Sequence, residues 1–216
     1  MTVPIFSIRN ADAVSRAGML LAAGELVIIP TDTVYGIATL PQYGDAIAQL
    51  YTIRDRPPEP AIPLLASETR FIHTLARPNP VALRLARRFW PGALTLILPP
   101  APALRRLFRG TPVAVRVPNL PTLSSLLHAA GGYLFVSGAK RAGYPPAITA
   151  QEAANIFKDK IALILDGGRA TYGVYSTIVD CVSATPTIER HGAIPEERIW
   201  EALENMTLPD SVTLDG

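Results

Sequence analysis

Short, continuous hydrophobic runs alternate along the chain with segments whose apolar residues recur at helical spacing. The run LVIIP at 26–30 contains no polar position, which is typical of a strand buried on both faces of a sheet. In the segment 43–53, Ala46, Ile47, Leu50 and Tyr51 fall three or four positions apart, as on one face of a helix. The alternation predicts an α/β domain in which helices flank an open sheet.

The same pattern predicts the remaining elements. Further strands are expected at 95–98, 113–117, 133–137, 161–165 and 177–182, and further helices at 11–23, 80–89, 122–130, 150–157 and 195–204. The segment 99–112 is rich in proline and arginine and is expected to be a surface excursion. The sequence has no internal repeat and no low-complexity linker. Residues 1–205 are therefore expected to form a single domain, followed by a short C-terminal tail at 206–216.

Composition narrows the class of protein. The chain has 216 residues, of which 49% are hydrophobic, enough for a self-sufficient core. Cys181 is the only cysteine, which excludes an internal disulfide, and its apolar neighbours predict a small buried residue. We find no secretory signal and no apolar run that could span a bilayer, so a cytoplasmic protein without a membrane partner is expected.

The cations are mostly arginine. There are 17 arginines against 3 lysines, and the arginine guanidinium binds carboxylate and phosphate groups in a fork. This usage favours an anionic ligand. Genome composition and thermal adaptation are the alternative explanation, and composition alone does not decide between them.

Small polar residues follow the first buried strand. Thr31, Asp32 and Thr33 come directly after the run at 26–30, and Gly36 follows shortly after. In open α/β sheets, ligands bind beyond the carboxyl ends of strands, so these side chains could orient a small polar substrate. The alternative is a turn in which they bond the local backbone.

Basic residues recur near other predicted strand and helix ends. Arg54 and Arg56 would point to the same side of an extended segment and could grip a polyphosphate, although cations at a helix end can simply pair with Asp55 or Glu59. Arg116 sits in an otherwise apolar strand and could reach a cleft or lie on a sheet edge. Lys140 lies in a glycine-bearing turn that could offer backbone N–H groups to an anion.

Taken in order, these motifs resemble the YrdC-like family of threonylcarbamoyl-AMP synthases over residues 5–204. The shared elements are Pro-Thr-Asp-Thr-x-Tyr-Gly at 30–36, a basic pair with proline at 54–57, Trp-Pro-Gly at 90–92, Leu-Thr-Leu at 94–96, Arg-x-Pro at 116–118, Leu-Asp-Gly-Gly at 165–168, Ser-Thr-x-Val-Asp at 176–180 and Arg-x-Gly-Ala-Ile at 190–194. The chain resembles the short, single-domain form of the family.

The resemblance implies a twisted open α/β sheet with flanking helices and a concave, basic cavity. It also implies an ATP-dependent, adenylate-forming nucleotidyltransferase. L-threonine, bicarbonate and ATP, with Mg²⁺, would give threonylcarbamoyl-AMP and pyrophosphate for tRNA threonylcarbamoyladenosine modification. Contact with RNA or tRNA and with partner proteins of tRNA modification would follow from the same role.

The resemblance also assigns residues to roles. Thr33 and Ser176 would contact threonine, Arg116 would bind its carboxylate, and Ser137 is a further candidate at the threonine site. The predicted catalytic residues are Arg54, Arg56 and Lys140. These three and Arg190 are the predicted nucleotide-binding residues, and no metal ligand is expected from protein side chains.

The sequence departs from the family pattern at two elements. Arg54 and Arg56 stand where the family has Lys-x-Arg, and Gly138 and Lys140 stand where it has Ser-x-Asn. Ser137 could supply the missing hydroxyl after a one-residue shift of the strand, although such a shift normally turns a side chain to the other face. Three hypotheses therefore stand: a synthase with a retuned site, a carbamoyltransferase-like enzyme with another acceptor, or a binder of nucleotide or RNA without synthase activity.

Overall fold

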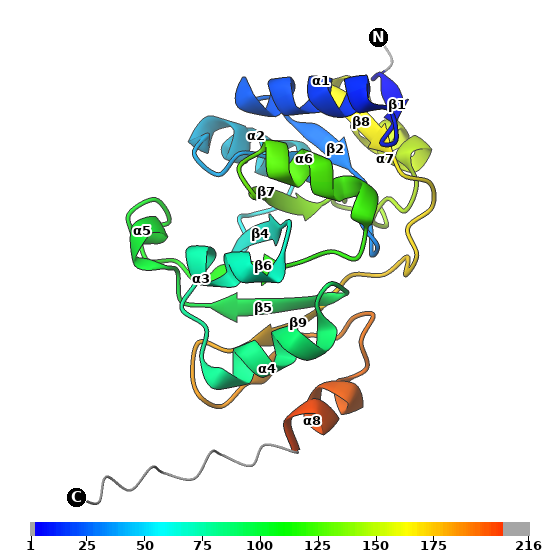
Figure 1. Ribbon diagram of the computed structural model, residues 1–216. Helices are drawn as coiled ribbons and strands as arrows, with labels where there is room; N and C mark the ends of the chain where they lie inside the picture. Colours follow the sequence, from blue (N-terminus) through cyan, green and yellow to red (C-terminus); the bar gives the residue numbers. More distant parts are fainter. Residues whose placement is uncertain (1–2, 205–216) are drawn as a thin grey trace, which may run out of the picture.

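The computed structural model describes residues 3–204 and contains one mixed sheet flanked by helices (Figure 1). The strands are β1 (Ile5–Ser7), β2 (Val27–Ile29), β3 (Gly36–Thr39), β4 (Ile62–Ala66), β5 (Leu94–Leu98), β6 (Val113–Arg116), β7 (Tyr133–Gly138), β8 (Leu163–Asp166), β9 (Thr177–Asp180) and β10 (Thr187–Arg190). The helices are α1 (Ala11–Ala22), α2 (Gly44–Arg54), α3 (Ile72–Leu75), α4 (Pro80–Phe89), α5 (Pro102–Arg105), α6 (Ser124–Ala129), α7 (Ala150–Phe157) and α8 (Glu196–Glu204). Three single 3-10 turns lie at Thr69–Phe71, Pro121–Leu123 and Lys158–Lys160.

The strand order is β1-β8-β2-β3-β7-β4-β6-β5-β9-β10. Parallel pairs (β1 with β8, β2 with β8, β4 with β6, β5 with β9) are mixed with antiparallel ones. Figure 1 shows helices α1 and α6 near one end of this ladder of strands and α4 and α8 near the other. The predicted twisted open α/β sheet is confirmed.

Local sequence fixes several helix ends. The Asn10 side chain accepts hydrogen bonds from the backbone N–H groups of Asp12 and Ala13 at the start of α1. Asn79 accepts from the backbone N–H of Ala82 at the start of α4. At the other end of α2, Asp55 adopts a left-handed conformation (φ 55°), which ends the helix immediately after Arg54.

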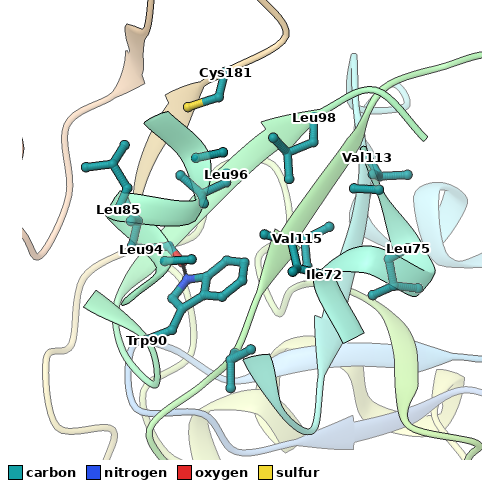
Figure 2. Packing of buried hydrophobic residues seen from close by; sticks show 14 of the residues in the cluster. Ile72, Leu75, Leu85, Trp90, Leu94, Leu96, Leu98, Val113, Val115 and Cys181 are labelled. Atoms are coloured by element: carbon teal, nitrogen blue, oxygen red, sulfur yellow. Dashed lines mark hydrogen bonds between the residues drawn. The ribbon is translucent and has the colours of Figure 1, made fainter. Parts of the chain in front are cut away.

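Three large apolar clusters hold the helices to the sheet. One joins α1 and α6 to the strands near Val27, and a second joins α2 and α7 to the strands near Phe135. The third joins α3, α4 and α8 to β4, β6, β5 and β9, and Figure 2 shows its packing around Trp90 and Val115. The indole N–H of Trp90 donates to the Leu94 carbonyl at 2.7 Å, so its buried polar group is satisfied.

Alternate side chains of β5 and β6 point to opposite faces of the sheet, one face packing in the third cluster and the other lining an open cavity. Leu94, Leu96, Leu98, Val113 and Val115 belong to the cluster (Figure 2). The intervening residues, Thr95, Ile97, Ala114 and Arg116, line the cavity. Successive side chains of a strand point to opposite faces, so the same two strands build the core and the site.

All of the predicted strands and helices are present, whereas four strands and the short helices α3 and α5 were missed. The predicted strands and helices correspond to β2, β5 to β9, α1, α2, α4, α6, α7 and α8, with ends differing by a few residues. The strands β1, β3, β4 and β10 were not predicted. The segment 99–112 contains α5 and buries Phe108 in the third cluster, so it is not only a surface excursion. The predicted tail at 206–216 lies outside the described residues.

The structure also bears on the predicted burial of Cys181 and on the search for a membrane-spanning segment. Cys181 is 1% exposed, as predicted, and burial raises the pKa of its thiol to about 12. Within residues 3–204, we find no helix with the length and apolar character needed to cross a membrane.

Candidate active site

A cavity of about 650 Å³ opens among β4, β6, β5, β9 and the loops around them. All eight predicted site residues line it: Thr33, Arg54, Arg56, Arg116, Ser137, Lys140, Ser176 and Arg190. The lining includes five cationic side chains (Arg54, Arg56, Arg116, Lys140, Arg190) and two carboxylates (Glu59, Glu189). A smaller hollow of about 250 Å³ near Gly18 and Gln42 carries no charged side chain in its lining.

Arg116 is held rigidly at the base of the cavity. Its guanidinium donates to the Gly92 carbonyl at 2.9 Å, to the Thr33 hydroxyl at 2.6 Å and to the Asp32 carboxylate. Burial lowers the pKa of Arg116, and the Asp32 charge opposes that effect. Three of the five guanidinium N–H groups are thus engaged, which leaves two for a ligand.

The polar residues after β2 form a local turn and also line the cavity, so both interpretations of the sequence apply to them. The Thr31 hydroxyl donates to the Val34 carbonyl at 2.6 Å and shares a hydrogen bond with the Thr33 hydroxyl at 3.0 Å. This is the local turn bonding of the alternative interpretation. Thr33 and Arg116 nevertheless face the same cavity, joined through their hydrogen bond, so the turn also shapes a binding surface.

A second group of hydroxyls lies at the start of β9. Ser176 and Thr95 share a hydrogen bond of 2.7 Å between their side-chain oxygens, and Arg190 donates to the Ser176 hydroxyl at 3.1 Å and to its carbonyl at 3.0 Å. Burial lowers the pKa of Arg190, while Tyr175 and Glu59 oppose the shift. This arrangement fixes a hydroxyl and a guanidinium side by side.

Arg54 closes α2 and is not part of an extended segment with Arg56. Its side chain is 3% exposed and donates to the Glu59 carboxylate at 2.9 Å. The same Glu59 oxygen accepts from the Ser137 hydroxyl at 2.6 Å. The expected geometry of two parallel arginines is therefore wrong, because the left-handed Asp55 separates them.

Arg56 and Lys140 are the less constrained cations. Within the described part of the chain, neither side chain makes a hydrogen bond or an ion pair, although both line the cavity. The turn after β7 does not offer a row of free N–H groups, because those of Ala139 and Lys140 already donate to the Tyr35 and Gly138 carbonyls. At these two positions, the Lys140 side chain is the group that remains to contact an anion.

Glu59 and Tyr175 are among the cavity residues that were not predicted as site residues. Glu59 was considered only as a partner for the arginines, yet one of its carboxylate oxygens, Oε2, is buried and accepts no hydrogen bond among the described residues. Tyr175, which immediately precedes Ser176, lines the cavity as well. The position of Tyr175 directly before Ser176 was an available signal, whereas Glu59 lies three positions beyond Arg56. Among the side chains that the structure describes, no three His, Cys, Asp or Glu residues converge as metal ligands.

We expect Glu59→Gln to lower the free energy of unfolding by about 1.5–3 kcal/mol, because the buried Arg54 would lose a charged hydrogen-bond acceptor. Chemical denaturation measures the change. Glu68→Gln is the matched control: Glu68 pairs with Arg70 and His128 on the exposed surface, where ion pairs contribute little. Equal stability of the two variants would contradict a structural role for the Arg54–Glu59 pair.

The fold and cavity define an α/β protein whose open site combines hydroxyls with clustered guanidinium groups. Comparison with known proteins identifies its relatives. The model of the Sua5/YciO/YrdC family, described as "Telomere recombination", matches residues 19–192. A Mycobacterium tuberculosis protein named as a candidate threonylcarbamoyl-AMP synthase is 37% identical over 199 residues, covering 90% of each chain.

A named enzyme and a solved structure extend this comparison. The threonylcarbamoyl-AMP synthase of Chromohalobacter salexigens is 34% identical over 177 residues, covering 81% of this chain and 95% of that protein. The crystal structure of Pyrococcus abyssi Sua5 complexed with L-threonine has a TM-score of 0.84 at 29% identity, and the match covers 94% of this chain and 61% of that one. The chain belongs to the Sua5/YciO/YrdC family, as its motif order predicted.

Proposed function

We propose that this protein is a threonylcarbamoyl-AMP synthase, an ATP-dependent, adenylate-forming enzyme. The observation that carries the proposal is the convergence of all eight predicted residues on one cavity, which presents hydroxyls and guanidinium groups together. Relatives of similar length carry this activity in their names, and the related Sua5 structure holds L-threonine.

We assign the threonine site to the region around Arg116. Its two remaining N–H groups can bind a carboxylate bidentately, and the Thr33 and Ser176 hydroxyls can orient the amino acid. Ser137 is the weaker candidate for this site because its hydroxyl already donates to Glu59. The Asp32 carboxylate accepts a hydrogen bond from Arg116, balances its charge and fixes its direction.

We assign the nucleotide to the other cations, Arg54, Arg56, Lys140 and Arg190. In the reaction, bicarbonate gives carbon dioxide and hydroxide, the neutral threonine amine attacks the carbon dioxide, and the proton that the nitrogen loses converts the hydroxide to water. An oxygen of the resulting carbamate then attacks the α-phosphorus, and the bond to the bridging oxygen breaks to release pyrophosphate. No covalent enzyme intermediate is needed. Arginine and lysine side chains contribute by positioning the reactants and by stabilising charge that develops on the phosphate oxygens.

A magnesium ion accompanying ATP fits the residues present. The sequence predicted no metal ligand from protein side chains, and the unbonded Oε2 of Glu59 departs from that expectation: it is a hard oxygen donor of the kind that Mg²⁺ prefers, and it would hold the ion together with phosphate oxygens and water. When bound, the ion would neutralise charge on the triphosphate. The product would serve tRNA modification in the cytoplasm, with RNA and partner proteins as further contacts of the pathway.

The proposal predicts pyrophosphate release from ATP that requires both L-threonine and bicarbonate. The measurement is a coupled pyrophosphate assay with purified protein and Mg²⁺, in which each substrate is omitted in turn. Serine in place of threonine is the matched control, since it retains the hydroxyl but lacks the methyl group. Release that is independent of threonine, or no release from folded protein, would overturn the proposal.

A further inference from the structure

Tyr175 packs against a predicted nucleotide-binding residue. The guanidinium carbon of Arg190 lies 4.7 Å from the centroid of the Tyr175 ring, within the range of a cation–π interaction. Arg190 is also tied to Ser176 through three hydrogen bonds. The ring and Ser176 together therefore fix the direction of this cation.

Gly138 makes room for the ring. A Cβ atom at position 138 would lie 2.6 Å from Cε1 of Tyr175 and 3.1 Å from its hydroxyl oxygen. Carbon atoms do not approach so closely without displacement. The absence of a side chain at the end of β7 thus lets the tyrosine reach over this strand into the cavity.

The Tyr175 hydroxyl is buried and has no hydrogen-bond partner among residues 3–204. Buried hydroxyl groups in proteins nearly always form a hydrogen bond, so an unbonded one indicates that a bound molecule supplies the acceptor. Burial raises the pKa of Tyr175, against the opposing influence of Arg54, Arg190 and Arg56, so the hydroxyl keeps its proton at neutral pH. A proton donor close to three guanidinium groups is suited to an anionic oxygen.

We infer that Tyr175 is a phosphate-binding residue: its hydroxyl donates a hydrogen bond to the polyphosphate of the nucleotide, while its ring holds Arg190. The inference rests on the proposed use of ATP. It adds to the phosphate site a residue that the sequence did not predict, since only the basic pair and the turn at 138–140 were expected to bind this anion. Gly138 and Tyr175 act together, because the glycine permits the position of the phenol.

The test is calorimetric titration of the wild-type protein and Tyr175→Phe with ATP, pyrophosphate and adenosine. We expect the variant to bind ATP and pyrophosphate about tenfold or more weakly, because a hydrogen bond to a charged group is lost. Adenosine binding and the thermal unfolding midpoint should not fall, because the hydroxyl has no partner in the protein. Gly138→Ala should weaken ATP binding similarly by displacing the ring.

The possible failures are distinguishable. Absence of ATP binding by the wild-type protein would contradict the proposed function itself. Wild-type binding that Tyr175→Phe leaves unchanged would overturn the inference alone. A lower unfolding midpoint with unchanged pyrophosphate affinity would show that the hydroxyl has a structural role and would equally overturn it.

Discussion

Asp32→Ala is expected to lower the free energy of unfolding by about 3–5 kcal/mol and to abolish threonine-dependent pyrophosphate release. Asp32 and Arg116 form an ion pair in which the two side chains are 3% and 9% exposed. Removal of the carboxylate leaves a buried guanidinium without its counter-charge. Arg190 adds to the penalty, since its charge also acts on Arg116.

The double variant Asp32→Ala/Arg116→Met separates stability from function. When both charges are replaced, no buried charge is left unpaired, and we expect a large part of the lost stability to return. Activity should not return, because the proposed carboxylate-binding residue is gone. Urea denaturation and the pyrophosphate assay on the wild type, both single variants and the double variant give the coupling between the residues. Additive losses of stability would contradict a buried pair.

The apolar strands and amphipathic helices could be predicted because the spacing of apolar residues along the chain shows which side chains face the core. In β5 and β6, Thr95 and Arg116 stand among otherwise apolar residues, and short, mostly apolar runs of this kind are typical of strands. β4 escaped prediction because Pro63 lies within it, although proline is normally confined to edge strands and β4 pairs with both β6 and β7. β10 was missed because its sequence, Thr-Ile-Glu-Arg, contains a single apolar residue and the strand lies at the edge of the sheet.

The site residues also divide into those that the sequence predicted and those that it did not. Residues carried by family motifs, such as Arg116 and Ser176, were predicted and line the cavity. Glu59 was missed as a site residue because its importance depends on Ser137, 78 positions away in sequence. The relation between Gly138 and Tyr175 was likewise hidden, since a glycine in a sequence does not say which side chain occupies the space it leaves.

Gly192→Ala is expected to reduce synthase activity by about a hundredfold or more. A Cβ at position 192 would lie 2.4 Å from the Ser176 carbonyl carbon, 2.5 Å from the Thr177 nitrogen and 2.5 Å from the Tyr175 carbonyl oxygen. All three atoms belong to backbone, so no side-chain rotation relieves the contact. The connection after β10 must move away from residues 175–177.

That displacement would separate the groups of the site from one another. The backbone N–H of Ala193 donates to the Tyr175 carbonyl at 2.9 Å, and that of Ile194 to the Thr177 hydroxyl at 3.0 Å, so the two segments are bonded on either side of the contact. Arg190 and Ser176 would lose their alignment, and a misplacement of about 1 Å can cost about a hundredfold in rate. Gly18→Ala in α1 is the matched control: its Cβ meets no atom within 4 Å, so it should keep activity and gain about 0.5–1 kcal/mol in stability. Retention of activity by Gly192→Ala would show that the alignment of Arg190 with Ser176 is not required for the reaction.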